Sequence, residues 1–352
     1  MIPTTRVRRT VAALAVSAAL LLTAACGSEE GGEDDTTDAA SSGPVATVSG
    51  PLGERPEIEI GKDPVVGEET VTRVLEEGDG AEIAEGSFLR MDVLARLVQG
   101  QEDLIDTWAS AAEDGGDDES QESESPDAED EGGAEDPRQQ IVSQAGVESY
   151  LPPSVTEPLI GKTVGSRVQV EGRAADVFGA DVAAQYGMAE DEGVVWVIDV
   201  VGAVEVEPKA RAEGEQAAVE EGMPEVEADG EKAATITIPE GQDPPEELRD
   251  QVLIEGDGAE VEAGQALAVQ YTGVTWADGE KFDSSWDRES ASAFQIGTGQ
   301  VVPGWDEGLV GKHVGDRVLL VLPPDMGYGE EEQEAIPAGS TLVFVVDIVG
   351  AA

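Results

Sequence analysis

The sequence predicts an α+β fold in which an antiparallel sheet wraps around one short helix. Two segments, 266–274 and 341–349, carry large apolar side chains at every second position, which places these side chains on one face of a strand. The residues on these faces are Leu267, Val269, Tyr271, Leu342, Phe344, Val346 and Ile348. A strong signal for a short helix occurs only at 303–310. Several strands with one short helix give an α+β domain.

The other elements follow from local patterns. Short apolar runs bounded by turn residues predict strands at 234–238, 251–254, 293–296 and 317–322. The helix at 303–310 begins with Pro303, which suits a first helical turn. Asp306 and Glu307 lie near the positive end of the helix dipole, where acidic side chains are favourable.

An internal repeat predicts a second copy of this domain. Residues 74–82 recur at 252–260, residues 159–168 at 309–318, and residues 195–202 at 343–350. We therefore expect domains at 51–205 and 235–352. Residues 206–234 are charged and contain Pro208 and Pro224, and we expect an interdomain linker there.

Six motifs of the second copy occur in a specific order. They are YTG from Tyr271, GEKFDSS ending at Ser285, VVPGWDEGL at 301–309, RVLLVLPP at 317–324, GYG around Tyr328 and TLVFVVDI at 341–348. In this order and spacing, residues 235–352 resemble an FKBP-type peptidyl-prolyl cis–trans isomerase domain. The resemblance implies the same α+β fold. It also implies an apolar pocket that needs no nucleophile, metal or cofactor.

The resemblance also implies roles for particular residues. Trp305 is expected to form the pocket floor under a proline ring, and Asp283 to lie at the edge, oriented by Tyr271 and Arg288. The backbone N–H of Val302 and the hydroxyl of Tyr328 are expected to bond the carbonyls that flank the proline. The expected walls are Tyr271, Phe282 and Phe344, joined by Val301, Val302 and Ile336. Taken singly, each aromatic could be a core residue, as we expect for Phe294, and Asp283 with Arg288 could be a surface ion pair.

The first copy lacks most of this set. Comparison of the two copies matches Val93 to Tyr271, Val155 to Trp305, Ile105 to Phe282, Phe178 to Tyr328, Asp106 to Asp283 and Trp196 to Phe344. We therefore expect a degenerate domain that packs but isomerises poorly.

Residues 113–136 form an acidic insert in this copy, in which 13 of 24 residues are Asp or Glu. A run of this kind cannot bury enough apolar surface to order itself. A calcium site is the alternative, but the insert lacks the regular ligand spacing of an EF-hand loop.

The N-terminus predicts export and lipid anchoring. Arg6, Arg8 and Arg9 precede an apolar run at 11–22, which is short for a membrane-spanning helix. Residues 22–27 read LTAACG and resemble a bacterial lipobox, in which Cys26 is lipidated. We expect a signal peptide at 1–26 and a disordered tether at 27–50; the alternative is an ordinary secretory signal.

Composition excludes several classes of function. The formal net charge is -56, with 76 acidic and 20 basic residues, which argues against nucleic-acid binding and favours a monomer. One cysteine and one histidine exclude an intrachain disulfide and a cysteine- or histidine-rich metal site.

Together these features favour an isomerase that helps proline-containing exported polypeptides fold at the outer face of the cytoplasmic membrane. The alternative is a non-catalytic polypeptide-binding chaperone or docking lipoprotein.

Overall fold

The computed structural model describes residues 44–67, 69–109, 137–185, 187–189, 191–228 and 230–352. All of them belong to one compact unit, Ser42–Ala352. The expected signal peptide with Cys26, most of the expected tether and the acidic insert at 113–136 lie outside the described residues. In the part of the chain that is described, no helix is long and apolar enough to cross a membrane.

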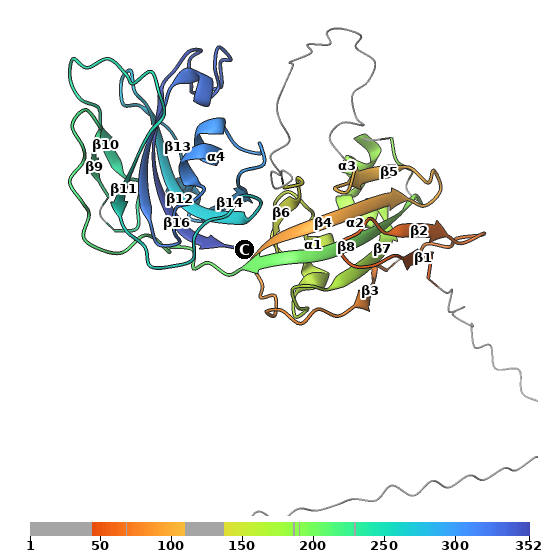
Figure 1. Ribbon diagram of the computed structural model, residues 1–352. Coiled ribbons are helices and arrows are strands. Elements are labelled where there is room, and N and C mark those ends of the chain that lie inside the picture. Colours follow the sequence, from red (N-terminus) through yellow and green to blue (C-terminus); the bar gives the residue numbers. More distant parts are fainter. Residues whose placement is uncertain (1–43, 68, 110–136, 186, 190, 229) are drawn as a thin grey trace, which may run out of the picture. The chain divides into compact units, whose positions relative to one another are not determined.

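The first domain is built on a six-stranded antiparallel sheet (Figure 1). Its strands are β3 (Val71–Glu76), β4 (Phe88–Leu97), β5 (Asp103–Asp106), β6 (Ile141–Gln144), β7 (Arg167–Arg173) and β8 (Gly193–Val204). The strand order is β3-β7-β8-β4-β5, and β6 also pairs with β4. Its short helices are α1 (Pro153–Thr156), α2 (Ala174–Phe178), α3 (Ala180–Gln185) and the 3₁₀ turn η1 (Glu157–Leu159).

The second domain has the same arrangement. Its strands are β11 (Arg249–Ile254), β12 (Ala266–Thr275), β13 (Lys281–Ser284), β14 (Ser292–Gln295), β15 (Arg317–Leu322) and β16 (Leu342–Ala351). The order is β11-β15-β16-β12-β13, and β14 also pairs with β12. Helix α4 (Pro303–Leu309) and the 3₁₀ turns η2 (Ser285–Arg288) and η3 (Pro324–Met326) complete the domain. The strands and the helix predicted from the sequence are confirmed, and the two sheets share the strand order that the repeat predicts.

Each sheet buries one face against its helix. In the second domain the period-two side chains of β12 and β16 form one cluster with Trp305 and Leu309 of α4. In the first domain Val155 of α1 joins the equivalent cluster with Leu89, Val93 and Trp196.

A two-stranded hairpin covers the other face of the first sheet. It pairs β1 (Ala46–Ser49) with β2 (Glu57–Ile60), and its Ala46 and Ile58 pack with Leu94 and Val197. The expected tether therefore ends earlier than residue 50, because β1 lies within that range. The alternating apolar residues of the hairpin are buried on the sheet, which makes the segment part of the domain.

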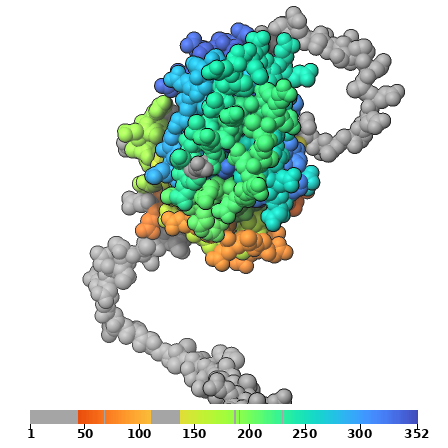
Figure 2. Space-filling view, turned by 90° about the vertical axis from the view of Figure 1, so that its left-hand side faces the viewer, coloured from red at the N-terminus to blue at the C-terminus, as the bar shows by residue number. Residues whose placement is uncertain are grey.

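A matching hairpin of β9 (Glu225–Glu227) and β10 (Thr235–Thr237) covers the outer face of the second sheet. In Figure 1 this hairpin lies on the face opposite α4. Figure 2 shows the green-to-teal segments, which carry β9 to β11, spread over this face. Part of the expected linker 206–234 packs on the second sheet, because Ala212, Met223 and Val226 are buried and β9 is paired.

Each sheet also contains one buried arginine–aspartate pair at the same place. Arg167 of β7 lies opposite Asp199 of β8, and Arg317 of β15 lies opposite Asp347 of β16. Both arginines donate two hydrogen bonds to their carboxylate, at 2.6 and 2.7 Å in the first sheet and 2.7 and 2.8 Å in the second. Such fork-to-carboxylate pairs fix strand register, and removal of one partner leaves a buried charge without compensation.

We predict that Arg317→Met lowers the free energy of unfolding by about 3–5 kcal/mol, because the buried Asp347 carboxylate then loses its counter-ion. The comparison is Lys281→Met, which breaks the exposed Lys281–Asp287 pair and should cost less than about 1 kcal/mol. Urea unfolding followed by circular dichroism measures both variants. Equal losses in the two variants would contradict the role given to the buried pair.

Candidate functional site

Five aromatic side chains of the second domain meet around α4. This aromatic cluster consists of Tyr271, Phe282, Phe294, Trp305 and Phe344. The Trp305 ring centroid lies 5.3 Å from Tyr271, 5.1 Å from Phe294 and 5.2 Å from Phe344, and Phe282 lies 5.5 Å from Phe344. Three of these pairs are edge-to-face, with interplanar angles of 83–85°: Tyr271 with Trp305, Trp305 with Phe344, and Phe282 with Phe344. Such contacts are favourable beyond simple burial.

The cluster is open on one side. The side chains of Trp305 and Phe344 are 6% and 5% exposed to solvent, while Tyr271, Phe282 and Phe294 are half-buried. Val301 and Val302 also pack half-buried against the cluster, and the buried Ile336 belongs to the same apolar core. The structure therefore brings together all of the apolar residues that the sequence proposes for the pocket. Tyr328, which follows η3, is 39% exposed.

Two glycines allow the rings to approach one another. A Cβ on Gly273 of β12 would lie 2.6 Å from the Phe282 ring and 2.8 Å from the Phe344 ring. A Cβ on Gly304 of α4 would lie 2.4 Å from Leu322 of β15. Any larger residue at either position would push the helix or the rings apart.

Asp306 fixes the position of α4 from the other side. Its carboxylate accepts hydrogen bonds from the backbone N–H groups of Gly297, at 2.6 Å, and Gly299, at 2.9 Å. Both glycines have positive φ, which they adopt without the steric cost that other residues would bear. The loop before α4, with Val301 and Val302, is thereby held against the apolar cluster that contains Trp305.

A polar triad borders the aromatic cluster. The Tyr271 hydroxyl donates to Asp283, and the Arg288 guanidinium donates to Asp283 at 2.5 Å and to the Tyr271 oxygen at 2.8 Å. The Arg288 guanidinium also lies 5.6 Å from the Tyr271 ring centroid and donates to the Ser292 hydroxyl at 3.2 Å. Asp283 and Arg288 are both substantially exposed, so their ion pair contributes little to stability, and its effect is to orient the Tyr271 ring.

The triad changes the ionisation of its members. Burial, and then the hydrogen bond to Asp283, raise the pKa of Tyr271 to about 12. Burial by itself opposes the charged form of Asp283, but hydrogen bonds from Tyr271 and Arg288 outweigh it and lower the pKa of Asp283. Tyr271 therefore stays a neutral hydrogen-bond donor and Asp283 a charged acceptor at neutral pH.

The first domain does not assemble this site. Val93 and Val155 lie where the second domain has Tyr271 and Trp305, as the sequence predicts, and both are fully buried. Trp196, at the position of Phe344, is also fully buried, with its ring centroid 5.6 Å from that of Phe178. A large indole thus fills the interior that the second domain leaves partly open.

The equivalences proposed for β5 are wrong by one residue. In the first sheet Ile105 lies opposite Ala95. In the second sheet Asp283 lies opposite Gly273, which corresponds to Ala95. Ile105 is therefore the structural equivalent of Asp283. Asp106 then corresponds to Ser284 and binds Arg55 instead, at 2.6 Å. Both ladders have their bulge at the same place, and the chain from Val93 to Leu104 is as long as that from Tyr271 to Phe282, so Leu104 corresponds to Phe282. The offset arose because Ile105-Asp106 was matched to Phe282-Asp283 by residue type.

Sequence reasoning missed two residues of the site. Phe294 was expected in the core, but it is half-buried and contacts Trp305. Ser292 bonds Arg288 and so extends the polar triad. The feature that identifies both residues is the pairing of β14 with β12. It places Phe294 opposite Leu267 and Ser292 opposite Val269, on the helix side of the sheet. Among the residues that the structure describes, no group of three histidine, cysteine or acidic side chains could hold a metal ion.

Comparison with known proteins agrees on one family. The model of the FKBP-type peptidyl-prolyl cis-trans isomerase family matches residues 258–349. An FK506-binding protein of Streptomyces anulatus is 43% identical over 111 residues, which cover 31% of this chain and 90% of the relative. A probable FK506-binding protein of Corynebacterium glutamicum is 41% identical over 116 residues, 33% of this chain and 96% of the relative. FK506-binding protein 2 of Podospora anserina is 48% identical over 87 residues, 25% of this chain and 47% of the relative, so the match spans about half of that protein.

We predict that Tyr271 titrates near pH 12, measured as the tyrosinate absorbance that the wild type shows and Tyr271→Phe lacks. Asp283→Asn should lower this midpoint and Arg288→Met should raise it, because their interactions act on the Tyr271 pKa in opposite directions. Since the folded pKa exceeds the ordinary value of about 10, the stability that Tyr271 contributes is complete below pH 10 and is lost as the pH rises through about 12. A Tyr271 midpoint at the ordinary value would contradict the burial and hydrogen bonding described above.

Proposed function

The chain belongs to the FKBP-type peptidyl-prolyl cis–trans isomerase family, and we propose that its aromatic cluster isomerises Xaa-Pro bonds in exported polypeptides. The observation that carries this proposal is the meeting of Trp305 with Tyr271, Phe294 and Phe344, within the segment that the family model matches. These rings come from four separate elements and form an apolar surface that is partly open to solvent. A proline ring has the size and apolar character to lie on such a surface.

The reaction requires rotation about an amide bond, not bond cleavage. Amide resonance opposes this rotation with a barrier of roughly 18–20 kcal/mol. In the transition state the carbonyl has lost conjugation with the proline nitrogen, so the amide is less charge-separated than in the planar ground state. An apolar surface that withholds water disfavours the planar form more than the twisted form, and each 1.36 kcal/mol of difference gives about tenfold in rate.

The aromatic cluster divides into a floor and walls under this proposal. The Trp305 ring lies under the proline ring, and Tyr271, Phe282 and Phe344 surround it with Val301, Val302 and Ile336. The backbone N–H of Val302 and the hydroxyl of the exposed Tyr328 donate to the carbonyls on either side of the proline. Asp283 and Arg288 hold the Tyr271 ring in place through its hydroxyl. Catalysis then comes from shape and from fixed hydrogen-bond donors.

We also propose that the first domain is a degenerate FKBP-like domain that does not isomerise. The shared strand order of the two sheets supports this relationship. Val93 and Val155 cannot provide an aromatic surface, and the buried Trp196 occupies its place. A purely polypeptide-binding chaperone is the second candidate function, because such a domain can contribute binding surface without turnover.

We propose further that the protein is exported and held at the outer face of the cytoplasmic membrane through a lipid on Cys26. The basic residues before the apolar run at 11–22, and the small residues before Cys26, support this location. A client that emerges from the membrane would then meet the isomerase on the side where it folds.

We predict that the full chain accelerates isomerisation of a short Xaa-Pro peptide, and that Trp305→Ala lowers kcat/KM by at least about tenfold, because the proline loses the floor of its site. Tyr328→Phe should lower kcat/KM by about two- to tenfold, which corresponds to the loss of one hydrogen bond. Because Tyr328 is exposed, this variant should fold normally. A peptide assay that follows the cis isomer by NMR exchange measures both.

Two controls accompany this assay. Trp286→Ala removes a tryptophan of the same domain that lines a separate small cavity beside Arg317 and Asp347, and it should leave kcat/KM unchanged. Val155→Ala alters the first-domain position equivalent to Trp305 and should also leave it unchanged. If the folded wild type shows no acceleration for any residue before the proline, the chaperone function is the correct one.

We predict that Cys26→Ser moves the protein from the membrane fraction to the soluble exported fraction, because one acyl anchor supplies most of its membrane affinity. Fractionation of bacterial cells that express each form, with mass spectrometry of the mature N-terminus, measures this. Retention of the Cys26→Ser variant in the membrane would exclude the lipid anchor.

A further inference from the structure

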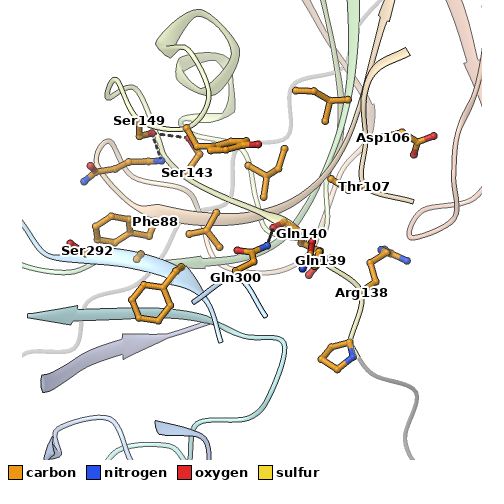
Figure 3. Close-up of a pocket in the computed structure, with 18 of the residues that line it drawn as sticks. Phe88, Asp106, Thr107, Arg138, Gln139, Gln140, Ser143, Ser149, Ser292 and Gln300 are labelled. Atoms are coloured by element: carbon orange, nitrogen blue, oxygen red, sulfur yellow. Dashed lines mark hydrogen bonds between the residues drawn. The ribbon is translucent and has the colours of Figure 1, made fainter. Parts of the chain in front are cut away.

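A cavity of about 1130 Å³ lies between the two domains, next to the aromatic cluster (Figure 3). The first domain lines it with residues 105–109 and 137–144 and with Phe88, Ser149 and Tyr150, and the second domain with residues 291–294 and Gln300. Its volume is above the roughly 300–1,000 Å³ of pockets that hold small molecules. The space is therefore large enough for a segment of extended polypeptide.

Glutamine side chains join the two domains at one end of this cavity. The amide of Gln300 donates to the carbonyl of Gln140 at 2.8 Å, and the side-chain oxygen of Gln295 accepts from the Gln140 N–H at 2.7 Å. Gln139 donates to the carbonyl of Thr298 at 2.9 Å. Figure 3 shows Gln139, Gln140 and Gln300 close together at this junction. The first domain is thus fixed beside the segment that carries Ser292 and Phe294.

The cavity borders the proposed isomerase site through two shared residues. Phe294 lines the cavity and also packs against Trp305, with ring centroids 5.1 Å apart. Ser292 lines it and accepts a hydrogen bond from Arg288, which in turn bonds Tyr271 and Asp283. The residues next to a proline on Trp305 are therefore close enough to the cavity for an extended chain to reach it.

The lining suits a neutral peptide backbone. Among the described residues of the lining, two side chains are charged, Asp106 and Arg138. Each is paired, Asp106 with Arg55 and Arg138 with the buried Asp92. The polar lining otherwise consists of amides and hydroxyls, namely Thr107, Gln139, Gln140, Ser143, Gln144, Ser149, Tyr150, Ser292 and Gln300. These groups can donate to and accept from peptide groups. The described lining is thus close to neutral although the whole chain has a net charge of -56. Such a surface does not select its ligand by charge.

A further feature fits a peptide ligand. Tyr150 on the cavity lining is 74% exposed, and exposed tyrosines are frequent anchors of peptide binding.

We propose that this cavity is an extension of the isomerase site that binds the residues flanking the client's proline, as an extended neutral chain. The inference rests on the proposed isomerase function for its position along the client. It gives the first domain a role, which is to supply one wall of the binding site. Client selection would then depend on both domains, although catalysis belongs to the second.

The test uses two labelled peptides and the full chain. One peptide is short, with a single Xaa-Pro bond, and the other carries about six additional neutral residues on each side, roughly 20 Å of extended chain per side. Fluorescence anisotropy measures the Kd of each peptide. Tyr150→Ala removes the exposed anchor, and Val142→Trp places a large side chain from β6 into the cavity. Val65→Trp is the matched control, because Val65 is 66% exposed and does not line the cavity.

We expect the wild type to bind the extended peptide about tenfold more tightly than the short one. A gain in affinity of this size is what one or two anchor residues provide. Tyr150→Ala and Val142→Trp should each remove most of this difference, and Val65→Trp should leave it unchanged. Trp305→Ala should weaken the binding of both peptides by the same factor, because both place their proline on the same ring.

Two outcomes would overturn the proposal. The first is equal affinity of the wild type for both peptides, or a difference that Tyr150→Ala and Val142→Trp both leave intact. The second is sedimentation of the wild type as a dimer that Tyr150→Ala dissociates, which would make the cavity lining a contact between two copies. Isomerisation of the short peptide is measured separately, so that its absence counts against the proposed function and the Kd values still decide the role of the cavity.

Discussion

The contact on which the second domain depends is the edge-to-face packing of the Trp305 indole against Tyr271 and Phe344. The three rings come from α4, β12 and β16, so this one contact joins the helix to the two central strands of the sheet. Gly273 leaves room for the Phe344 and Phe282 rings, and Gly304 lets α4 pack closely against Leu322 of β15. A buried apolar contact of this kind is worth several kcal/mol, and here it also leaves a ring surface within reach of solvent.

The first domain retains what holds the sheet together and has lost what opens the site. Its Arg167–Asp199 pair is equivalent to Arg317–Asp347, and the outer hairpin is present in both domains. By contrast, Val93 and Val155 replace two rings, and the indole of Trp196 fills the interior completely. Stability and recognition are thus carried by different residues of one fold, which explains how one copy can lose a pocket and remain folded.

Most of the sheet could be predicted because long strands such as β12 and β16 place large apolar residues at every second position. Of the hairpin strands, β10 was predicted but β1, β2 and β9 were not, since a strand as short and charged as Glu225–Glu227 has no recognisable period. The aromatic cluster was predicted from motif spacing within one domain. Asp106 was misplaced by one residue because it was matched to Asp283 by residue type, and a one-residue shift exchanges the two faces of a strand. The cavity depends on contacts such as that of Gln140 with Gln295, 155 residues apart in the sequence, which no local pattern encodes.

The distribution of the few basic residues explains how so acidic a chain can present a neutral binding surface. Arg288 neutralises Asp283 at the aromatic cluster, Arg138 neutralises Asp92 behind the cavity, and Arg55 neutralises Asp106 at its wall. Because attraction between opposite charges at contact is stronger than the screened field of distant carboxylates, the surface at these points is close to neutral. The remaining acidic residues act at longer range, where they repel acidic polypeptides before contact. Under the proposed function, selection by charge would therefore act during the approach of a client, and selection by apolar shape and backbone hydrogen bonding would act at the site itself.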